Sequence, residues 1–510
     1  MTTTLSLSPR RLAVVAAAAL AIPIAGCGSS DSSSSGATDP AKAVPASAPF
    51  YLEATVQPTG KQRAGVEAAL SKILRTGDPA GTLKQLIDTS AAKDGQTFDK
   101  DIKPWLGDKA AVAITGVVAG HPQVAVVVNS TDDGKAQDAL SRDKQYTSKR
   151  SYEGVDYRYD ASDQSAAGVT KGFVVAGDEP AFKQVVNVLD KGADSLATNA
   201  DLSDARAKVG GQPGFIFVDM QSLLRSVAGN AGSTLGPQEL STIDNLFKRY
   251  RAFGVGISAD ANAIRMTVVT LGEGSGSGNG PGSTLPLDKV PGDAWLALTQ
   301  KDFGKQLAGF LDSFKDSSLS DQLTQLETAT GLNLKDDVSS WMGDVSMFVE
   351  GDSVPAIGAG LVVQSTDPAK TRSTIDKIRG LARQFNARLG PAPAGTSAGF
   401  TVRTGKGKPV LIGLAGSRFV IAYGNKAFRD AVHPSSTLGS NSTFQGASGL
   451  LGSSAQPSFY LNWQTVVRFI TLAAGSDPGF AKAKPYLDAF TAVIGGGSGD
   501  RKAEVAIGLK

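Results

Sequence analysis

The sequence predicts an α+β protein built from two tandem, homologous halves, each a largely antiparallel β-sheet packed with helices. Three observations lead to this fold class. Apolar residues follow helical spacing in some segments and form short β-rich runs in others. The chain of 510 residues exceeds one typical domain. Short blocks of sequence recur once, in the same order, on either side of a Gly/Ser-rich stretch at residues 273–284.

Helical spacing occurs near the start of each half. Val66, Leu70 and Leu74 follow one another at intervals of four residues, and Phe303 and Leu307 begin a similar apolar series. Residues spaced in this way lie on one face of a helix. The sequence therefore predicts an amphipathic helix early in each half.

A hairpin and a capped helix are expected next. Residues 111–118 and 124–128 are β-rich runs around a Gly-His-Pro sequence, which predicts two antiparallel strands. A helix is expected after Asp132 and, in the second half, after Asp367. A short carboxylate at this position accepts the free N–H groups of the first helical turn.

The end of the first half predicts more strands. A strand at residues 173–176 leads into a helix whose apolar stripe includes Phe182. A further helix is expected at residues 239–250, followed by closing strands at residues 253–257 and 264–271. Strands linked by hairpins with helices between them favour a largely antiparallel sheet.

The repeated blocks indicate an internal duplication. Their separations stay close, for example 246 residues at the first block (290 − 44) and 236 at the tryptophan block (341 − 105). Conserved order with similar spacing is the sequence signature of a repeat, and two copies make a pair rather than a solenoid. The matching blocks are 44–52 with 290–296, 101–108 with 337–344, 127–132 with 362–367, 173–176 with 419–422, 181–183 with 427–429, and 212–213 with 456–457.

The first residues read as a targeting segment. Arg10 and Arg11 precede an uncharged apolar run at residues 12–24, which is too short to span a bilayer comfortably. The run ends in a lipobox-like motif formed by Ile24, Ala25, Gly26 and Cys27. This order predicts export, attachment of a diacylglycerol to the cysteine and cleavage just before it. The arginine pair leaves both the general and the twin-arginine export routes open.

The composition of the chain argues against several classes of function. Cys27 is the only cysteine, so its lipidation would leave no thiol for disulfides, thiolate catalysis or soft-metal binding. Lys and Arg exceed Asp and Glu by 51 − 48 = 3, and by 49 − 48 = 1 once Arg10 and Arg11 are removed. A near-neutral chain lacks the basic footprint of a nucleic-acid-binding protein.

These features together resemble a known family. The lipobox with its Ser-rich tether, the 44–52 block, the Pro-Trp-Leu-Gly-Asp block at residues 104–108 and the two-part repeat are similar to an uncharacterised family of exported bacterial lipoproteins. That family is catalogued as a domain of unknown function and is common in high-GC Gram-positive bacteria. The resemblance implies location and architecture, and it carries no known activity or site residues.

The sequence shows no catalytic centre. Its two histidines are His121, in a Gly-His-Pro sequence, and His433, at the end of an expected helix. No Gly-x-Ser-x-Gly elbow surrounds a serine. Two separated histidines without a free cysteine make zinc and copper sites improbable. We expect no catalytic residues, no metal ligands and no cofactor.

Carboxylates gather around one tryptophan in each half. They could form a Ca²⁺ site or an acid/base pair. The favoured alternative is a structural block, in which the tryptophan anchors a core, Gly107 and Gly343 allow a tight turn, and an aspartate accepts backbone N–H groups before the next strand. The candidate ligand or structural residues are Trp105 with Asp99, Asp101 and Asp108, and Trp341 with Asp336, Asp337 and Asp344.

Glycine-rich and aromatic segments carry weaker signals. Residues 405–408 read as a hairpin turn rather than a phosphate loop, because the Gly-Lys-Ser/Thr ending is missing. Residues 495–497 read as a bulge or a close backbone contact. Most aromatic residues belong to cores, but six could line an apolar pocket: Phe50, Tyr51, Trp295, Phe459, Tyr460 and Trp463.

The sequence predicts a lipid-anchored protein on the extracytoplasmic face of the cell membrane. Its parts are a signal peptide (1–26), a lipidated tether (27–43), a first α+β repeat (44–272), a linker (273–284) and a second repeat (285–510). We expect a non-enzymatic binding or scaffold protein whose partner is an envelope protein, glycan or lipid. The alternatives are a carrier or sensor of an apolar ligand held between the halves and, less favoured, a carboxylate-based hydrolase.

Overall fold

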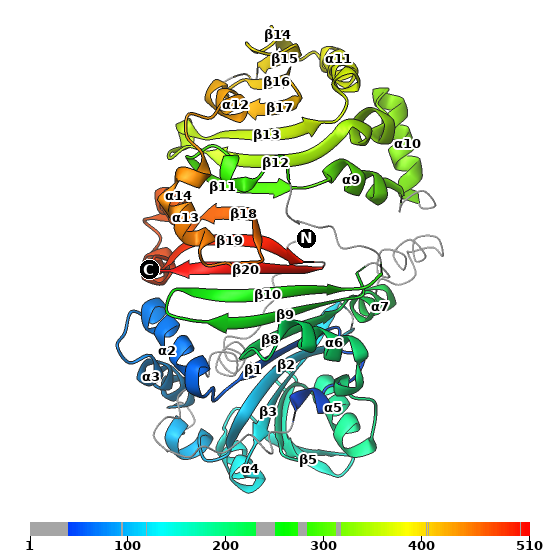
Figure 1. Ribbon diagram of the computed structural model, residues 1–510. Coiled ribbons are helices and arrows are strands. Elements are labelled where there is room, and N and C mark those ends of the chain that lie inside the picture. The colour runs from blue at the N-terminus through cyan, green and yellow to red at the C-terminus, as the bar shows by residue number, and fades with distance from the viewer. Residues whose placement is uncertain are drawn as a thin grey trace. The chain divides into compact units, whose positions relative to one another are not determined.

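The computed structural model describes residues 39–92, 95–118, 120–230, 250–273, 283–312, 318–403, 405, 407–499 and 501–510 (Figure 1). The described residues divide into two compact units. Unit 1 contains those up to residue 273, and unit 2 contains those from residue 283 onward. No described helix has the length and apolar character needed to cross a membrane.

Unit 1 contains one antiparallel sheet of ten strands. Neighbouring strands pair in the order β4-β5-β6-β7-β3-β2-β1-β8-β9-β10. The strands are β1 Phe50–Thr55, β2 Leu106–Val118, β3 His121–Ser130, β4 Ser148–Tyr152, β5 Val155–Asp160, β6 Ser165–Thr170, β7 Phe173–Asp178, β8 Gly214–Asp219, β9 Ala252–Ala259 and β10 Ala263–Leu271.

Unit 2 contains a second ten-stranded antiparallel sheet, in the order β14-β15-β16-β17-β13-β12-β11-β18-β19-β20. Adding ten to each strand number of unit 1 gives this order. The strands are β11 Ala294–Gln300, β12 Met342–Glu350, β13 Gly358–Ser365, β14 Arg388–Gly390, β15 Ala398–Arg403, β16 Val410–Ala415, β17 Arg418–Tyr423, β18 Gln456–Asn462, β19 Phe490–Gly499 and β20 Lys502–Leu509. The predicted α+β class with antiparallel sheet is confirmed.

Helices occupy the same connections in both units. In unit 1 they are α2 Gly60–Leu74, α3 Pro79–Ala91, α4 Asp133–Arg142, α5 Glu179–Lys191, α6 Ala200–Val209 and α7 Met220–Asn230, with short turns η1 Pro40–Lys42, η3 Phe98–Ile102 and η4 Leu196–Thr198. In unit 2 they are α9 Phe303–Asp312, α10 Ser318–Thr330, α11 Pro368–Gln384, α12 Asn425–Val432, α13 Ser442–Ser448, α14 Trp463–Ala474 and α15 Pro478–Leu487. Its short turns are η5 Leu287–Lys289, η6 Leu334–Val338, η7 Ser339–Trp341, η8 Val354–Ala356 and η9 Leu438–Ser440.

Local sequence explains where two of these helices begin. The Asp132 side chain accepts the backbone N–H of Lys135 at the start of α4. At the start of α11, Asp367 accepts the N–H groups of Ala369 and Lys370. These are the two helix starts for which the sequence predicts a capping aspartate, and both carboxylates satisfy otherwise free first-turn donors. The helix expected at residues 239–250 lies outside the described residues.

Each unit has its own apolar core against the sheet. In unit 1 the stripe of α5 is buried through Phe182, Val185 and Val186, and Phe182 packs against Tyr157 with ring centroids 4.8 Å apart. In unit 2 the shorter helix α12 buries Phe428 in the core. Helices that bury one stripe on a sheet give the layered arrangement expected of α+β proteins.

The glycines of the tryptophan blocks do not form tight turns, contrary to the sequence interpretation. Gly107 and Gly343 lie inside β2 and β12 and have no positive φ. Both glycines lie where the pairing register of the strand shifts. A Cβ added to Gly107 would lie 2.7 Å from Cβ of Asn129, and a Cβ added to Gly343 would lie 2.9 Å from the carbonyl oxygen of Gln364. Glycine is needed there because the neighbouring strand approaches closely at a bulge.

Two other glycine predictions agree with the structure. Residues 405–408 lie between β15 and β16, which pair antiparallel as a hairpin. The pairing of β18 with β19 shifts register between Pro457 and Phe459, opposite Gly496 and Gly495. A Cβ on Gly496 would lie 2.1 Å from the carbonyl oxygen of Gln456, so this strand also requires a glycine for close backbone contact.

Candidate functional site

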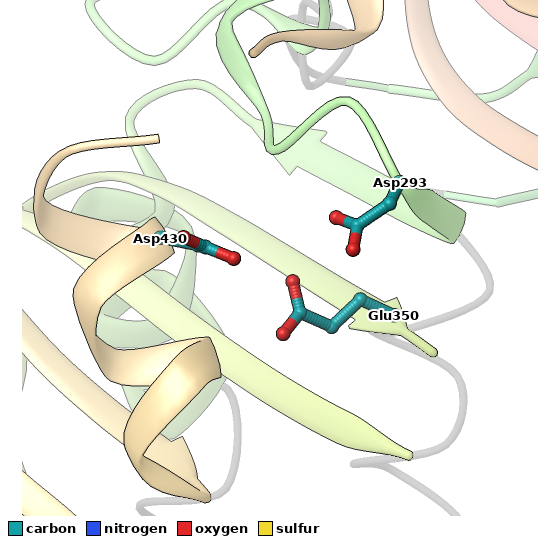
Figure 2. Close-up of side chains that lie close together, drawn as sticks. All are labelled: Asp293, Glu350 and Asp430. Atoms are coloured by element: carbon teal, nitrogen blue, oxygen red, sulfur yellow. The ribbon is translucent and has the colours of Figure 1, made fainter. Parts of the chain in front are cut away.

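Three carboxylates from separate elements of unit 2 converge at one place. They belong to Asp293, before β11, Glu350, at the end of β12, and Asp430, in α12 (Figure 2). One oxygen of each carboxylate lies within 4.8 Å of the other two. We call these residues, together with Lys426, the acidic cluster.

Strand alternation directs Glu350 inward. Phe348 and Glu350 lie on the buried face of β12, whereas Met347 is exposed and Val349 is half-buried. Successive side chains of a strand point to opposite faces, so the glutamate shares the core-facing side with Phe348. Gly358, opposite on β13, makes room for it, because an added Cβ would lie 3.3 Å from Oε1 of Glu350.

A tight turn positions Asp293. The N–H of Ala294 donates to the carbonyl oxygen of Pro291 at 3.1 Å, and the N–H of Gly292 donates to that of Ser436 at 2.9 Å. The first bond closes the turn, and the second holds the chain just before β11 against the segment that follows α12. The aspartate side chain is half exposed, at 50%.

Helix α12 supplies two of the four charged side chains of the acidic cluster. Lys426 and Asp430 are one turn apart, and Nζ of Lys426 donates to Oδ2 of Asp430 at 2.6 Å. The same ammonium donates to Oδ2 of Asp293 at 2.6 Å and lies 3.1 Å from Oε1 of Glu350. Residues four apart lie on one face of a helix, which explains why the two side chains reach the cluster together.

Burial is uneven across the acidic cluster and shifts its proton affinities. The Glu350 side chain is 1% exposed. Burial, together with the negative charge of Asp293, raises the pKa of Glu350 to about 7, although Lys426 acts in the opposite direction. Burial alone would lower the pKa of Lys426, but its hydrogen bonds to Asp293 and Asp430 raise it above its usual range. Near neutral pH the Glu350 carboxyl can therefore take up or release a proton.

Unit 1 contains a different buried charged network. Arg206 binds both carboxylate oxygens of Asp39, at 2.6 and 3.1 Å, and donates to Oε2 of Glu53 at 2.6 Å. The same glutamate accepts a hydrogen bond from the Tyr51 hydroxyl at 2.7 Å and one from Nζ of Lys109 at 2.8 Å. We call these five residues the arginine network. Each of its carboxylates is hydrogen-bonded to a cation.

The predicted site residues fall into two groups. Ile24, Ala25, Gly26 and Cys27 lie outside the described residues. Trp105 and Trp341 are buried, and each donates its indole N–H to the carbonyl oxygen four residues earlier, Asp101 for the first and Asp337 for the second. Both tryptophans therefore pack as anchors at the end of a short turn.

The carboxylates near these tryptophans are dispersed over separate partners. Asp99 pairs with Lys84 at 3.0 Å, and buried Asp101 pairs with Arg142 at 2.9 Å. Asp108 is exposed on β2. In unit 2, Asp337 pairs with Lys377 at 2.5 Å, while Asp336 is exposed. These carboxylates do not form a shared ligand set.

Asp344 has a defined local role. Its Oδ2 accepts hydrogen bonds from the backbone N–H of Thr284 at 2.6 Å and from the hydroxyl of Ser283 at 3.0 Å, and its Oδ1 accepts one from the N–H of Asp302 at 2.8 Å. Burial would raise the pKa of Asp344, but these donors lower it below its usual value. The carboxylate lies within β12, not in a turn before the strand, and its counterpart in the repeated block, Asp108, makes no such clamp because it points to solvent.

The remaining candidates are not members of the acidic cluster. His121 is an exposed residue at the start of β3, and His433 is exposed at the end of α12. Tyr51 and Tyr460 are fully buried, each in the core of its own unit. The other four aromatic candidates are Phe50 in unit 1 and Trp295, Phe459 and Trp463 in unit 2. The rings of Trp295 and Phe469 have centroids 5.6 Å apart, and those of Trp463 and Phe490 have centroids 6.3 Å apart.

One surface hollow lies on unit 1 near α3, with a volume of about 480 Å³. Its lining is largely polar or small, which differs from the apolar lining typical of a lipid-binding pocket. The lining residues are Gly81, Lys84, Gln85, Asp88, Thr89 and Ala92.

Sequence reasoning missed the acidic cluster. One signal was available, because Glu350 occupies a core-facing position in the alternation of β12, where a charged residue is unusual. Asp293 and Asp430 gave no signal, since they lie 137 residues apart (430 − 293) and only the packing of α12 brings them together.

The comparisons with known proteins place the chain in a family. The fold defines an α+β protein with two ten-stranded antiparallel sheets. Residues 11–493 match the family described as "Protein of unknown function (DUF3352)", and the chain belongs to this family. No curated protein matches it.

Solved structures give only weak likenesses. Crystal form III of TP0453 has a TM-score of 0.27 and 14% identity, covering 47% of this chain and 82% of that one. Crystal form IV has a TM-score of 0.26 and 13% identity, with coverage of 46% and 81%. Crystal form I has a TM-score of 0.17 and 11% identity, with coverage of 78% and 97%. At these TM-scores the likeness has no bearing on the function of this chain.

Proposed function

We propose that the chain is an exported lipoprotein, anchored by a lipid on Cys27, whose two units form a non-enzymatic binding or scaffold protein on the extracytoplasmic face of the membrane. The observation that carries this proposal is the lipobox at the end of an uncharged apolar run, followed by a Ser-rich segment. The family match begins at residue 11, inside the expected leader, which supports treating the leader as part of the family's sequence pattern.

The start of the folded region is compatible with a short tether. Arg206 holds Asp39, the first described residue, by a bidentate ion pair within unit 1. Cys27 precedes it by 12 residues (39 − 27). A flexible Ser/Gly-rich chain of this length has a root-mean-square reach of about 20 Å. The anchor would therefore keep unit 1 close to the membrane surface, where envelope proteins, glycans and lipids are accessible partners.

We also propose that the two units descend from one duplicated ancestor. The shared strand order supports this, as do matched local features. Pro45 bridges to Ser195 in unit 1 as Pro291 bridges to Thr437 in unit 2. If this is right, sequence profiles built from the first halves of family members should detect their second halves; failure to detect them would favour independent origins.

Substitution of the lipidated cysteine tests the anchor. Cys27→Ala should move the protein from the membrane fraction to the soluble fraction, and mass analysis of the wild-type N-terminal peptide should show a diacylglycerol on the sulfur. Ser32→Ala, in the tether, is the matched control and should remain with the membrane. Equal membrane retention of Cys27→Ala, or an unmodified sulfur on an uncleaved leader, would refute the proposal.

A further inference from the structure

The acidic cluster contains more negative than positive charge. Its three carboxylates surround a single ammonium, that of Lys426, so full ionisation leaves a net charge of −2 (1 − 3). Like charges held this close repel one another unless a cation or a proton lies between them. This excess of negative charge favours the binding of a cation at the cluster.

Glu350 points into the acidic cluster without a hydrogen bond. Its side chain is 1% exposed and forms an ion pair with Lys426 at Oε1, yet neither of its carboxylate oxygens has a hydrogen-bond partner among the described residues. Figure 2 shows the carboxylate directed toward those of Asp293 and Asp430. A buried carboxylate without donors is costly, and a bound cation would satisfy it.

The fold itself does not require this charge. The shared strand order, the matched turns, the buried side chain of Thr115 and the buried stripe of α5 identify the corresponding positions of unit 1. None of these positions carries a charged side chain. They are Ser47 for Asp293, Thr115 for Glu350, Pro180 for Lys426 and Gln184 for Asp430.

The cluster is also accessible from one side. The Asp293 and Lys426 side chains are 50% and 55% exposed, whereas those of Glu350 and Asp430 are 1% and 14% exposed. An ion can therefore approach past the two exposed groups. Lysine has a long, flexible stem, so its ammonium can leave for solvent when another cation takes its place.

We propose that Asp293, Glu350 and Asp430 form a divalent-cation site, and that Lys426 is an internal counter-ion which the metal displaces. Carboxylate oxygens in an all-oxygen site favour Ca²⁺, because three carboxylates can supply up to six ligand atoms and water can complete the shell. The sequence led us to expect no metal ligands, and these three residues lie far apart along the chain. This inference does not depend on the lipid at Cys27.

Calcium titration of the full chain, purified in detergent and stripped with EDTA, tests the site. Isothermal titration calorimetry with CaCl₂ should show one site with a Kd on the order of 10⁻⁴ to 10⁻³ M. Glu350→Gln should abolish that binding. Asp336→Asn, which removes an exposed carboxylate of the same unit, is the matched control and should bind Ca²⁺ as the wild type does.

A second variant tests the displacement of the ammonium. Lys426→Met removes the competing cation, so Ca²⁺ should bind about tenfold more tightly than to the wild type. If this variant does not fold, the comparison of wild type with Glu350→Gln carries the test. Absence of saturable binding to the wild type, binding that survives Glu350→Gln, or binding seen in Lys426→Met alone would each overturn the proposal.

Discussion

Glu53 in β1 of unit 1 and Glu350 in β12 of unit 2 are both buried glutamates, but their surroundings differ. Glu53 receives hydrogen bonds from Arg206, Lys109 and Tyr51. Glu350 has one ion pair and no hydrogen bond among the described residues. The arginine network thus neutralises its carboxylates completely, whereas the acidic cluster leaves one carboxylate incompletely satisfied.

The difference shows which buried charges serve the fold. The positions that correspond to Asp39, Glu53 and Arg206 in unit 2 are Leu285, Thr299 and Ser448. Each sheet therefore forms without the buried charges that the other unit contains at the corresponding positions. A network with every donor and acceptor paired adds stability, whereas a buried group left unpaired is a candidate for binding.

Removal of the central cation should have the largest effect. Arg206→Ala leaves Asp39 and Glu53 facing each other without their guanidinium, and we expect a loss of about 4 kcal/mol in the free energy of unfolding. Urea denaturation measures the loss, and hydrogen exchange of β1 peptides assigns it to unit 1. Lys208→Ala, on the same helix α6 and in an exposed pair with Asp204, is the control. If both variants lose little free energy of unfolding, and by the same amount, the arginine network does not stabilise unit 1.

The same substitution of the two glutamates should change the free energy of unfolding in opposite directions. Glu53→Gln breaks charge-assisted hydrogen bonds and should lower the free energy of unfolding by about 3 kcal/mol. Glu350→Gln removes a poorly solvated charge and should raise it by about 2 kcal/mol at pH 8 in EDTA. Unit-resolved hydrogen exchange measures both. A destabilised Glu350→Gln would mean that its ion pair with Lys426 stabilises unit 2.

The two units should also respond differently to pH. The pKa of Glu350 is raised to about 7 in the folded chain, so its contribution is fully present below the unfolded pKa of about 4.5 and is lost as pH rises through 7. Unit 2 should lose on the order of 2 kcal/mol between pH 5 and pH 8 in EDTA. The charged groups that surround the glutamate are Asp293, Asp430 and Lys426.

Unit 1 should lose stability in the opposite direction. Burial would raise the pKa of Asp39, but Arg206 lowers it below 3.8, so its contribution is present above that value and is lost at lower pH. Thermal unfolding from pH 3 to pH 8, with hydrogen exchange to monitor each unit, distinguishes the pH range in which unit 1 loses stability from that in which unit 2 does. Glu350→Gln should remove the dependence of unit 2, and a slope that persists in this variant would assign it to another group.

A steric substitution should have the smallest effect. Gly358→Ala would place a Cβ 3.1 Å from Cβ of Ala427 and 3.3 Å from Oε1 of Glu350, so we expect a loss of about 1 kcal/mol from crowding. The corresponding residue of unit 1 is Gln123, which already carries a side chain, and Gln123→Ala should change stability little. Equal effects in urea denaturation would mean that Gly358 is not needed to accommodate the glutamate.

Local patterns along the chain were sufficient for much of the fold. Alternation and helical spacing predicted the α+β class, the β2–β3 hairpin and the helices capped by Asp132 and Asp367. These features depend on residues close in sequence, where a short side chain or a period of two or 3.6 decides the conformation. The interpretation of Gly107 and Gly343 as turn residues was wrong, because their role depends on a neighbouring strand.

By itself, the sequence determined the class of fold, and it predicted a boundary near residue 273 and a lipidated Cys27. Only the tertiary structure decided which charges meet. It dispersed the aspartates near Trp105 among separate partners and brought Asp293, Glu350 and Asp430 within 4.8 Å. The reason is physical: secondary structure follows from local periodicity, whereas a site of several charges depends on strand register and helix packing between residues far apart in the chain.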